Sequence, residues 1–203
     1  MRRAIMAGLG LTGLLAAAGG CGSAEKDAAL PSTGTTASVL RAYAESGTFA
    51  AWADDQTAIT YDPALVPIGA NATVTVSPAV VETVVQLDIQ GLLPSRGYGA
   101  HLHTNVCGAK PDDAGPHYQH HHDPKAAASP PSVDPSFANP SNEVWLDFTT
   151  DVAGTASVSS TVQWRFDQTT PPRSLIIHTE HTKTAPGKAG TAGTRLACIT
   201  LPE

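Results

Sequence analysis

Eight histidines carry the clearest chemical signal in this sequence, and all of them lie between positions 101 and 181. His101 and His103 stand two residues apart in a run that favours a β-strand, so both imidazoles are expected on one face of it. His117 follows in a tight turn, and His178 ends an apolar run. Four imidazoles on such a support suit copper or zinc, and not magnesium or calcium. The pattern therefore predicts a metal centre.

The elements that must position these histidines read as short β-strands separated by turn residues. The 18 glycines and 16 prolines disfavour long helices, and the few aromatic residues leave Val, Ile, Leu and Ala to fill the core. Strands are expected at 58–61, 72–77, 82–89, 98–104, 143–149, 156–166, 174–179 and 195–201. Such a set indicates an all-β sandwich or barrel. The long breaks at about 105–142 and 180–193 are typical of functional loops.

The N-terminus predicts export. A methionine and two arginines precede an apolar run over 4–18, which is too short to span a bilayer comfortably, and small residues lead up to Cys21. This arrangement resembles the bacterial lipoprotein box, in which the cysteine after the cleavage site is lipidated. Ala18 departs from the box, because a branched aliphatic residue is usual there. An ordinary secretory signal cleaved after Ala18 is the alternative.

Three segments are therefore expected. Residues 1–20 would be a signal peptide, 21–47 a flexible tether held at a membrane by a lipid on Cys21, and 48–203 the β domain. A short helix around 39–44 is compatible with the tether. The alternative for this segment is a tail without a role.

The charge balance excludes one class of partner. The chain has 12 basic and 18 acidic residues, and its formal charge of −6 argues against a nucleic-acid binder. Loss of the two arginines in residues 1–20 would take the charge to −8. From position 178 to position 195, three cations nevertheless oppose a single anion, Glu180, so this loop is locally positive. The cations are Lys183, Lys188 and Arg195.

Four stretches, taken in order, resemble copper/zinc superoxide dismutases. They are GAHLHTNVCG at 99–108, AGPHY at 114–118, SLIIH at 174–178 and AGTRLACITL at 192–201. The resemblance covers about residues 57–202. It implies a Greek-key, eight-stranded antiparallel barrel or sandwich with two long functional loops. The activity that it implies is copper-dependent dismutation of superoxide to dioxygen and hydrogen peroxide.

The resemblance also implies roles for individual residues. The copper ligands it assigns are His101, His103, His117 and His178. His117 would also bridge to zinc in a two-metal member and carry a proton during turnover, and Arg195 would attract and orient superoxide. Cys107 and Cys198 resemble the family's intrasubunit disulfide, which would tie the metal loop to the last strand.

The zinc half of the family's site is matched less completely. Its candidate ligands here are His120, His122 and Asp123, within a run of three histidines and an aspartate. A solvated polar loop explains this run equally well. No later histidine precedes His178, and the family's acidic link in the second loop is missing. A copper-only site is therefore credible beside a copper and zinc site. In the copper-only case Glu143 or Asp147 would hydrogen-bond His117 in place of zinc. The alternative for both acids is an ordinary solvent-facing position on a strand.

Three functions are compatible with the sequence. The first is a copper-dependent superoxide dismutase at the extracytoplasmic cell envelope, anchored through a lipid on Cys21. The alternative is a non-enzymatic copper-binding lipoprotein on the same fold, which buffers or senses copper. The third is a structural β-domain of the chordin type, which His117, His178 and the stretch 195–198 disfavour. The sequence does not indicate an oligomeric state.

Overall fold

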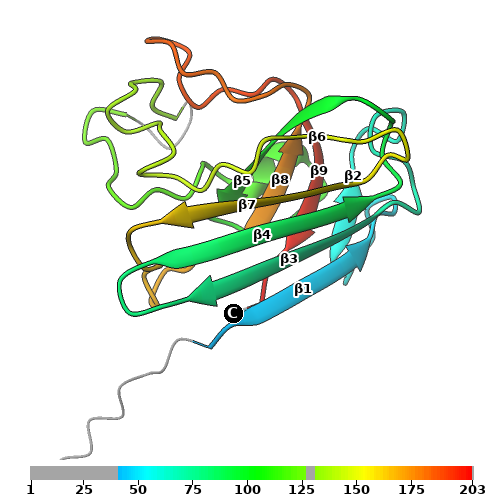
Figure 1. Cartoon of the computed structure of the whole chain (residues 1–203), viewed down its shortest axis with the longest axis horizontal. Coiled ribbons are helices and arrows are strands. Elements are labelled where there is room, and N and C mark those ends of the chain that lie inside the picture. Colours follow the sequence, from blue (N-terminus) through cyan, green and yellow to red (C-terminus); the bar gives the residue numbers. More distant parts are fainter. Residues whose placement is uncertain (1–40, 127–130, 203) are drawn as a thin grey trace, which may run out of the picture. The chain divides into compact units, whose positions relative to one another are not determined.

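The computed structural model describes residues 41–126 and 131–202. Within these residues the protein is all-β: nine strands form two antiparallel sheets, and one short 3₁₀-helix, η1 (Pro111–Ala114), lies in a loop (Figure 1). Buried residues of both sheets form the main hydrophobic core. The all-β sandwich expected from the sequence is confirmed. No helix in the described ranges is long and apolar enough to cross a membrane.

The first sheet has the strand order β1-β3-β4-β7. Its strands are β1 (Tyr43–Thr48), β3 (Asn71–Pro78), β4 (Thr83–Gln90) and β7 (Ala156–Val162). Apolar and polar residues alternate along β4, so Val85 and Leu87 are buried while Gln86 faces solvent. This period of two is the pattern of an antiparallel sheet with one face on the core and one in water.

The second sheet has the order β2-β9-β8-β5-β6. Its strands are β2 (Ala58–Thr60), β9 (Arg195–Thr200), β8 (Ser174–His178), β5 (Gly97–His103) and β6 (Phe148–Thr149). All five residues of β8 are buried, because Leu175 and Ile177 pack in the main core while Ile176 packs in a second cluster with Ala114 and Cys198. The face of this sheet away from the core is therefore covered, and polar side chains on it can be buried.

Strand β1 corrects the expected boundary of the domain. The sequence favours a tether over 21–47, whereas the structure pairs Tyr43–Thr48 with β3 along its whole length. The strand lies at the edge of its sheet, and none of its side chains is fully buried, so its hydrophobic signal is weak. Tyr43 and Ala44 belong to this strand, so the short helix considered at 39–44 is wrong for these two residues. The signal peptide, Cys21 and the tether up to residue 40 lie outside the described residues.

The expected strand 143–149 is also different. Only its penultimate and last residues form regular strand, as β6, and isolated bridges join Glu143 to Gln119 and Trp145 to His101 upstream of it. The Trp145 side chain donates a hydrogen bond to the Glu143 carboxylate, so side-chain contacts are formed here where a regular ladder was expected. The segment thus becomes a frame for the site described below.

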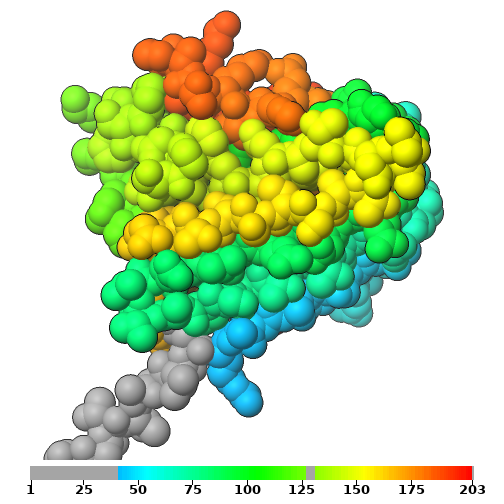
Figure 2. Space-filling view, viewed as in Figure 1, coloured from blue at the N-terminus to red at the C-terminus, as the bar shows by residue number. Residues whose placement is uncertain are grey.

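The two long loops expected from the sequence are present, and they contact each other. The second loop, residues 179–194, has paired arms, as in the hydrogen bond from Lys183 N to Thr191 O at 2.9 Å. Figure 2 shows this loop, in orange, against the yellow-green part of the first loop. One bond between them runs from Gly187 N to Val133 O at 3.2 Å. The loops together cover the part of the second sheet that carries the histidines.

Candidate metal centre

The structure brings the four histidines of the sequence motifs together. One ligand atom from each of them lies within 4.8 Å of the others. The ring centroids of His101 and His117 are 4.1 Å apart, and those of His101 and His178 are 4.9 Å apart. His103 completes the group. Among the described residues, no other set of three or more histidine, cysteine or acidic side chains comes close enough to share an ion.

Strand geometry explains why these residues meet. His101 and His103 project from one face of β5, and Leu102 between them points into the main core. Strand β8 pairs antiparallel with β5, which places His178 opposite Gly99 and beside the same face. The turn after η1 is held to β5 by a bridge between His103 and His117. Three separate segments therefore deliver four imidazoles to one place.

Each imidazole has one ring nitrogen bound by the protein. The bonds are His101 Nε2 to Thr182 Oγ1 at 2.6 Å, His103 Nδ1 to Gly115 O at 2.9 Å, His117 Nδ1 to Glu143 Oε2 at 2.9 Å, and His178 Nδ1 to Gly193 O at 3.4 Å. Backbone carbonyls only accept, so His103 and His178 carry their protons on Nδ1. These partners leave the opposite nitrogen of each ring free to bind a metal through its lone pair.

The free nitrogens fit a metal. His101 Nδ1, His103 Nε2 and His178 Nε2 are buried and have no hydrogen-bond partner in the described structure. Buried polar atoms are rarely left unpaired, and three in one place require an explanation. His117 adds a fourth nitrogen, Nε2, because its Nδ1 is bound by Glu143. A ring of imidazole nitrogens is the donor set that copper or zinc prefers.

The electrostatics of the site keep His101, His103 and His178 neutral. Burial lowers the pKa of His101 and of His103 well below the usual value, and the neighbouring His117 lowers both further. Burial, followed by the charge of His117, lowers the pKa of His178 to about 3. Neutral imidazole is the form that binds a metal, so the site does not have to release protons from these three rings to bind one.

Glu143 occupies the far side of His117. Its side chain is 2% exposed, and it accepts hydrogen bonds from His117 Nδ1 at 2.9 Å, Gln119 Nε2 at 2.7 Å and Trp145 Nε1 at 2.6 Å. Three donors satisfy a buried carboxylate that would otherwise be costly. Of the two acids that the sequence offered as hydrogen-bond partners of His117, Glu143 is the one that makes this bond. Asp147, the other candidate, instead binds Thr182.

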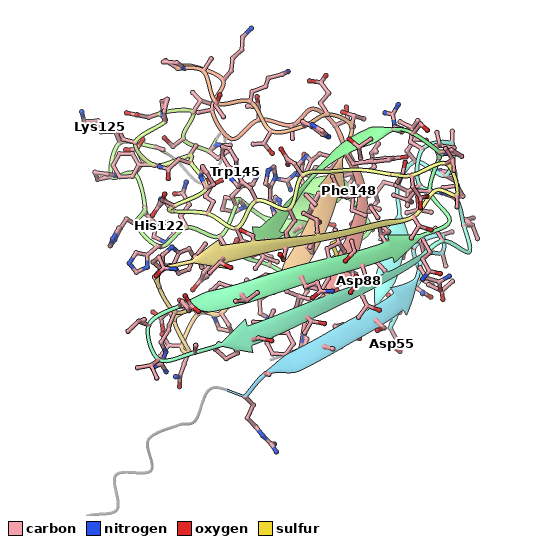
Figure 3. The ribbon with its side chains drawn as sticks, in the orientation of Figure 1. Asp55, Asp88, His122, Lys125, Trp145 and Phe148 are labelled. Carbon is pink, nitrogen blue, oxygen red and sulfur yellow. A yellow bond between two sulfur atoms is a disulfide. The ribbon has the colours of Figure 1, made fainter. Side chains whose placement is uncertain are left out.

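The structure does not assemble the zinc ligands considered from the sequence. His120 is exposed, and its ring packs on Trp164 at 4.8 Å between centroids. Asp123 accepts hydrogen bonds from Ser132 Oγ at 2.6 Å and Lys125 N at 2.8 Å. His122 is exposed and lies at the outer side of the loop (Figure 3). These side chains form no metal group within the residues described.

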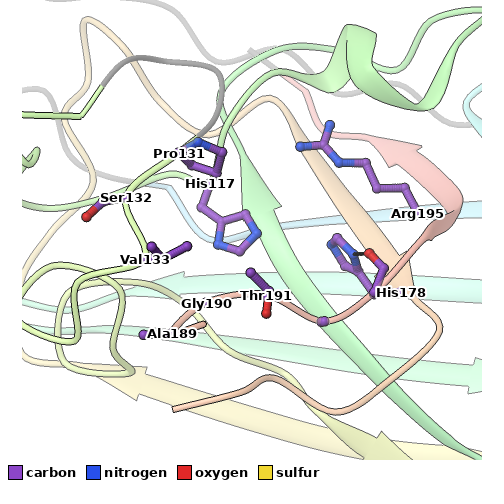
Figure 4. Close-up of a pocket in the computed structure, with 11 residues that line it drawn as sticks. His117, Pro131, Ser132, Val133, His178, Ala189, Gly190, Thr191 and Arg195 are labelled. Carbon is purple, nitrogen blue, oxygen red and sulfur yellow. Dashed lines mark hydrogen bonds between the residues drawn. The ribbon is translucent and has the colours of Figure 1, made fainter. Parts of the chain in front are cut away.

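A pocket of 150 Å³ opens beside the histidines (Figure 4). His117, His178 and Arg195 line it, together with parts of both loops. The Arg195 guanidinium is held by two carbonyls, Pro111 O at 3.0 Å and Gly115 O at 2.8 Å. These bonds fix a positive charge at the pocket wall, next to the free nitrogens.

The disulfide implied by the resemblance is present. Cys107 and Cys198 are bonded, at a sequence separation of 91. Cys198 lies in β9, three residues after Arg195, and Cys107 precedes the segment whose carbonyls hold that arginine. The bond therefore ties the two sides of the Arg195 contact to each other.

Sequence reasoning missed several side chains that hydrogen-bond the histidines or Glu143. Thr182 lies 81 residues from His101, in a loop without regular pattern, so nothing in its neighbourhood indicates the contact. Gln119 and Trp145 were also not singled out. Trp145 shares a face with Glu143 at a spacing of two in an extended segment, which is the one signal that could have suggested it.

Similar proteins are found among solved structures, but not among family models or curated proteins. No protein-family model matches the chain, and no curated protein gives a significant match. Solved structures that are similar include a copper/zinc superoxide dismutase from Brucella abortus. That match has 20% sequence identity, covers 79% of this chain and 100% of the other, and has a TM-score of 0.46.

Proposed function

We propose that this protein is a copper-dependent superoxide dismutase that works outside the cytoplasm, at the cell envelope. One observation carries the proposal: three buried imidazole nitrogens without partners converge with His117 beside a pocket walled by Arg195. The sequence motifs that supply these residues resemble copper/zinc superoxide dismutases. A buffering or sensing protein would need the four ligands, but it would have no use for a fixed cation at the pocket.

The four histidines would hold the copper. His101 would offer Nδ1, and His103, His117 and His178 would offer Nε2. Bound copper supplies a centre that can gain and lose one electron, which dismutation needs and which zinc cannot provide. The described residues offer no assembled zinc site, so copper alone is the composition we propose.

The pocket selects the substrate by size and charge. Its 150 Å³ is well below the roughly 300–1,000 Å³ of pockets that take organic ligands. It therefore suits a small inorganic anion such as superoxide. Arg195 would attract and orient that anion, because its guanidinium is held rigidly by two carbonyls at the pocket wall.

His117 is equipped to hold a proton at Nε2. Its Nδ1 is bonded to Glu143, so a proton on Nε2 would produce an imidazolium that faces a buried carboxylate. A hydrogen bond between an imidazolium and a carboxylate is charge-assisted. The side chain of His117 is 10% exposed and lines the pocket, so a proton held there lies next to the substrate.

The location is proposed from two features. The disulfide between Cys107 and Cys198 suits an oxidising compartment, where such bonds persist. The N-terminal sequence resembles an export signal that ends at a lipidated Cys21. Mass spectrometry of the mature N-terminus tests the anchor: a lipid-modified Cys21 is expected, and an unmodified one would remove the anchor from the proposal.

Activity of the copper-loaded protein tests the function. Wild-type protein loaded with copper should dismute superoxide much faster than a His178→Ala variant treated in the same way. Metal analysis after loading with copper and zinc should find one copper and no zinc per chain. Stoichiometric copper binding with no activity above that of His178→Ala would instead identify the buffering protein.

A further inference from the structure

A threonine of the second loop stands between a proposed copper ligand and an acid. Thr182 Oγ1 lies 2.6 Å from His101 Nε2 and 2.6 Å from Asp147 Oδ1. The backbone N of Thr182 donates to the other oxygen, Asp147 Oδ2, at 2.7 Å. Both carboxylate oxygens of Asp147 therefore point at one residue, and the three side chains form a continuous hydrogen-bonded chain.

The chemistry of these groups fixes the direction of each bond. A carboxylate oxygen only accepts, so Thr182 donates its single hydroxyl proton to Asp147. The lone pairs of Thr182 Oγ1 then face His101, and the His101 Nε2 must carry a proton in order to donate to them. The other nitrogen, His101 Nδ1, keeps its lone pair, and it is the buried atom without a partner.

A glycine lets the loop come this close. Gly99 lies on β5, two residues before His101. A Cβ at Gly99 would lie 2.5 Å from Glu180 O and 2.8 Å from Ala192 Cβ, both of which belong to the second loop. Because only a hydrogen atom occupies this space, the loop can pass low over β5 and bring Thr182 to His101.

We propose that Thr182 is a positioning residue for the metal centre: with Asp147 it selects the tautomer of His101 that presents Nδ1 to copper. This inference rests on the proposed function, because it takes the four histidines to be the copper site. The other three rings are held through Nδ1, so His101 is the ring whose ligand atom must be the opposite nitrogen. A proton on Nδ1 would block that atom, because a metal needs the lone pair.

The Asp147→Asn substitution should reverse the chain of bonds. The asparagine oxygen can still accept from Thr182 N, and its amide group would then donate to Thr182 Oγ1. The threonine hydroxyl proton would turn toward His101 Nε2, and the ring proton would move to Nδ1, the ligand atom. Thr182→Val, in contrast, removes the hydroxyl, so that no hydrogen bond at Nε2 favours either tautomer of His101. Asp147→Asn should therefore damage the site more than Thr182→Val does.

The tautomer can be measured in the metal-free full-length protein. Long-range ¹H–¹⁵N NMR spectra distinguish a protonated ring nitrogen from an unprotonated one. We expect His101 to be protonated on Nε2 in the wild type and in Thr182→Ser, and on Nδ1 in Asp147→Asn. Protonation of His101 on Nδ1 in the wild type, or an unchanged Nε2 proton in Asp147→Asn, would overturn the inference.

Copper(II) affinity, measured by competition with a chelator, gives the second readout. Thr182→Ser should bind like the wild type, Thr182→Val about 10-fold more weakly, and Asp147→Asn about 100-fold more weakly, as is typical when partners of metal ligands are lost. The double variant should lose no more copper affinity than Thr182→Val alone, because without the hydroxyl Asp147→Asn has no hydrogen bond to reverse. If the two single variants lost equal copper affinity and these losses added in the double variant, Asp147 would not act on His101 through Thr182.

Matched controls separate positioning from general damage. Thr161→Val and Asp88→Asn make the same chemical changes on the first sheet, and they should leave copper affinity unchanged. The outcomes also separate the two proposals. If the copper-loaded wild type fails to dismute superoxide while the NMR result holds, the proposed function fails and the role of Thr182 stands. If the wild type is active and Asp147→Asn keeps its tautomer and affinity, Thr182 has no positioning role.

Discussion

The four imidazoles differ in what holds them, and this decides which of them a mutation can loosen. His103 and His178 donate to backbone carbonyls, so the fold itself fixes their tautomers. His117 and His101 depend on side chains, one an acid and the other a hydroxyl. A substitution outside the ligand set can therefore disturb the second pair without unfolding the protein, and it cannot reach the first pair in this way.

Replacing Glu143 with glutamine should weaken copper binding. Glutamine offers one accepting oxygen where the carboxylate now accepts three donors, so at least one donor loses its partner. We expect copper affinity to fall by about 10-fold. Stability should fall by about 1–3 kcal/mol, the cost of a buried unpaired group. Chelator competition and chemical denaturation measure the two effects. Glu45→Gln, on β1, is the control, and a similar loss there would contradict the assignment.

Replacing Arg195 with alanine should separate catalysis from metal binding. The guanidinium lines the pocket but supplies no ligand atom, so copper affinity should stay within a few-fold of wild type. The second-order rate constant with superoxide should fall by about 10- to 100-fold, within the range of electrostatic steering effects. Arg195→Lys should recover little of it, because lysine cannot reproduce the fork that binds two carbonyls. A parallel loss of copper would mean that Arg195 acts by holding the site together.

At this scale the sequence predicts ligands better than their partners. The four histidines were predictable because imidazoles at strand spacing, in a turn and at a strand end have few other reasons to recur together. Glu143 and Asp147 could not be told apart, because a spacing of four places both on one face of an extended segment. Which acid reaches His117 depends on where the first loop returns to the sheet. Thr182 was unpredictable, since only tertiary folding brings it to His101.

Among the elements, the disulfide joins the last strand to the segment before η1. Cys107→Ser combined with Cys198→Ala removes it without leaving a lone thiol. We expect a loss of about 2–5 kcal/mol in the free energy of unfolding, as is typical for native disulfides. Denaturant titration of the metal-free protein measures this. Activity should fall as well, because the carbonyl partners of Arg195 lie in the segment that is released. Unchanged stability would show that packing of the second cluster suffices.

The strands show where hydrophobic pattern decides structure and where it does not. Strand β4 alternates apolar and polar residues and was predicted nearly to its ends, because one of its faces packs on the core. Strand β1 was missed, since an edge strand with half-buried side chains needs little hydrophobic pattern. The segment 143–149 has strand-like composition, but side-chain bonds near Glu143 replaced regular pairing over most of it.

For the molecule as a whole, stability should fall at high pH. Burial raises the pKa of Tyr43 and of Tyr61 to about 12, so the folded state favours their neutral forms. An unfolded chain loses these protons near the ordinary value of 10. The stabilisation is therefore complete below pH 10 and is lost as the pH rises from 10 through 12. Denaturation at pH 9 and pH 11.5 measures the fall, and Tyr43→Phe should reduce it. An equal fall in that variant would exclude Tyr43 as a source.

The overall charge should oppose the substrate, and the second loop should offset this locally. Lys183 Nζ is 2.6 Å from Glu180 Oε2, so this exposed pair cancels, whereas no described acid pairs with Lys188. Lys188→Glu should lower the rate constant with superoxide at low ionic strength. The substitution replaces a local cation with an anion in a chain whose formal charge is already −6. The difference should shrink as salt is added. A difference that persists at high salt would point to a structural effect instead.

The narrow passage over Gly99 has a consequence for how this protein can evolve. A ligand histidine can be judged by the chemistry of its side chain, but Gly99 has no side chain to donate a hydrogen bond, carry a charge or pack in the core. One added methyl group there would push the second loop away from β5, and the loop carries both Thr182 and a wall of the pocket. The second loop can therefore change in sequence and still reach the site only while position 99 remains a glycine.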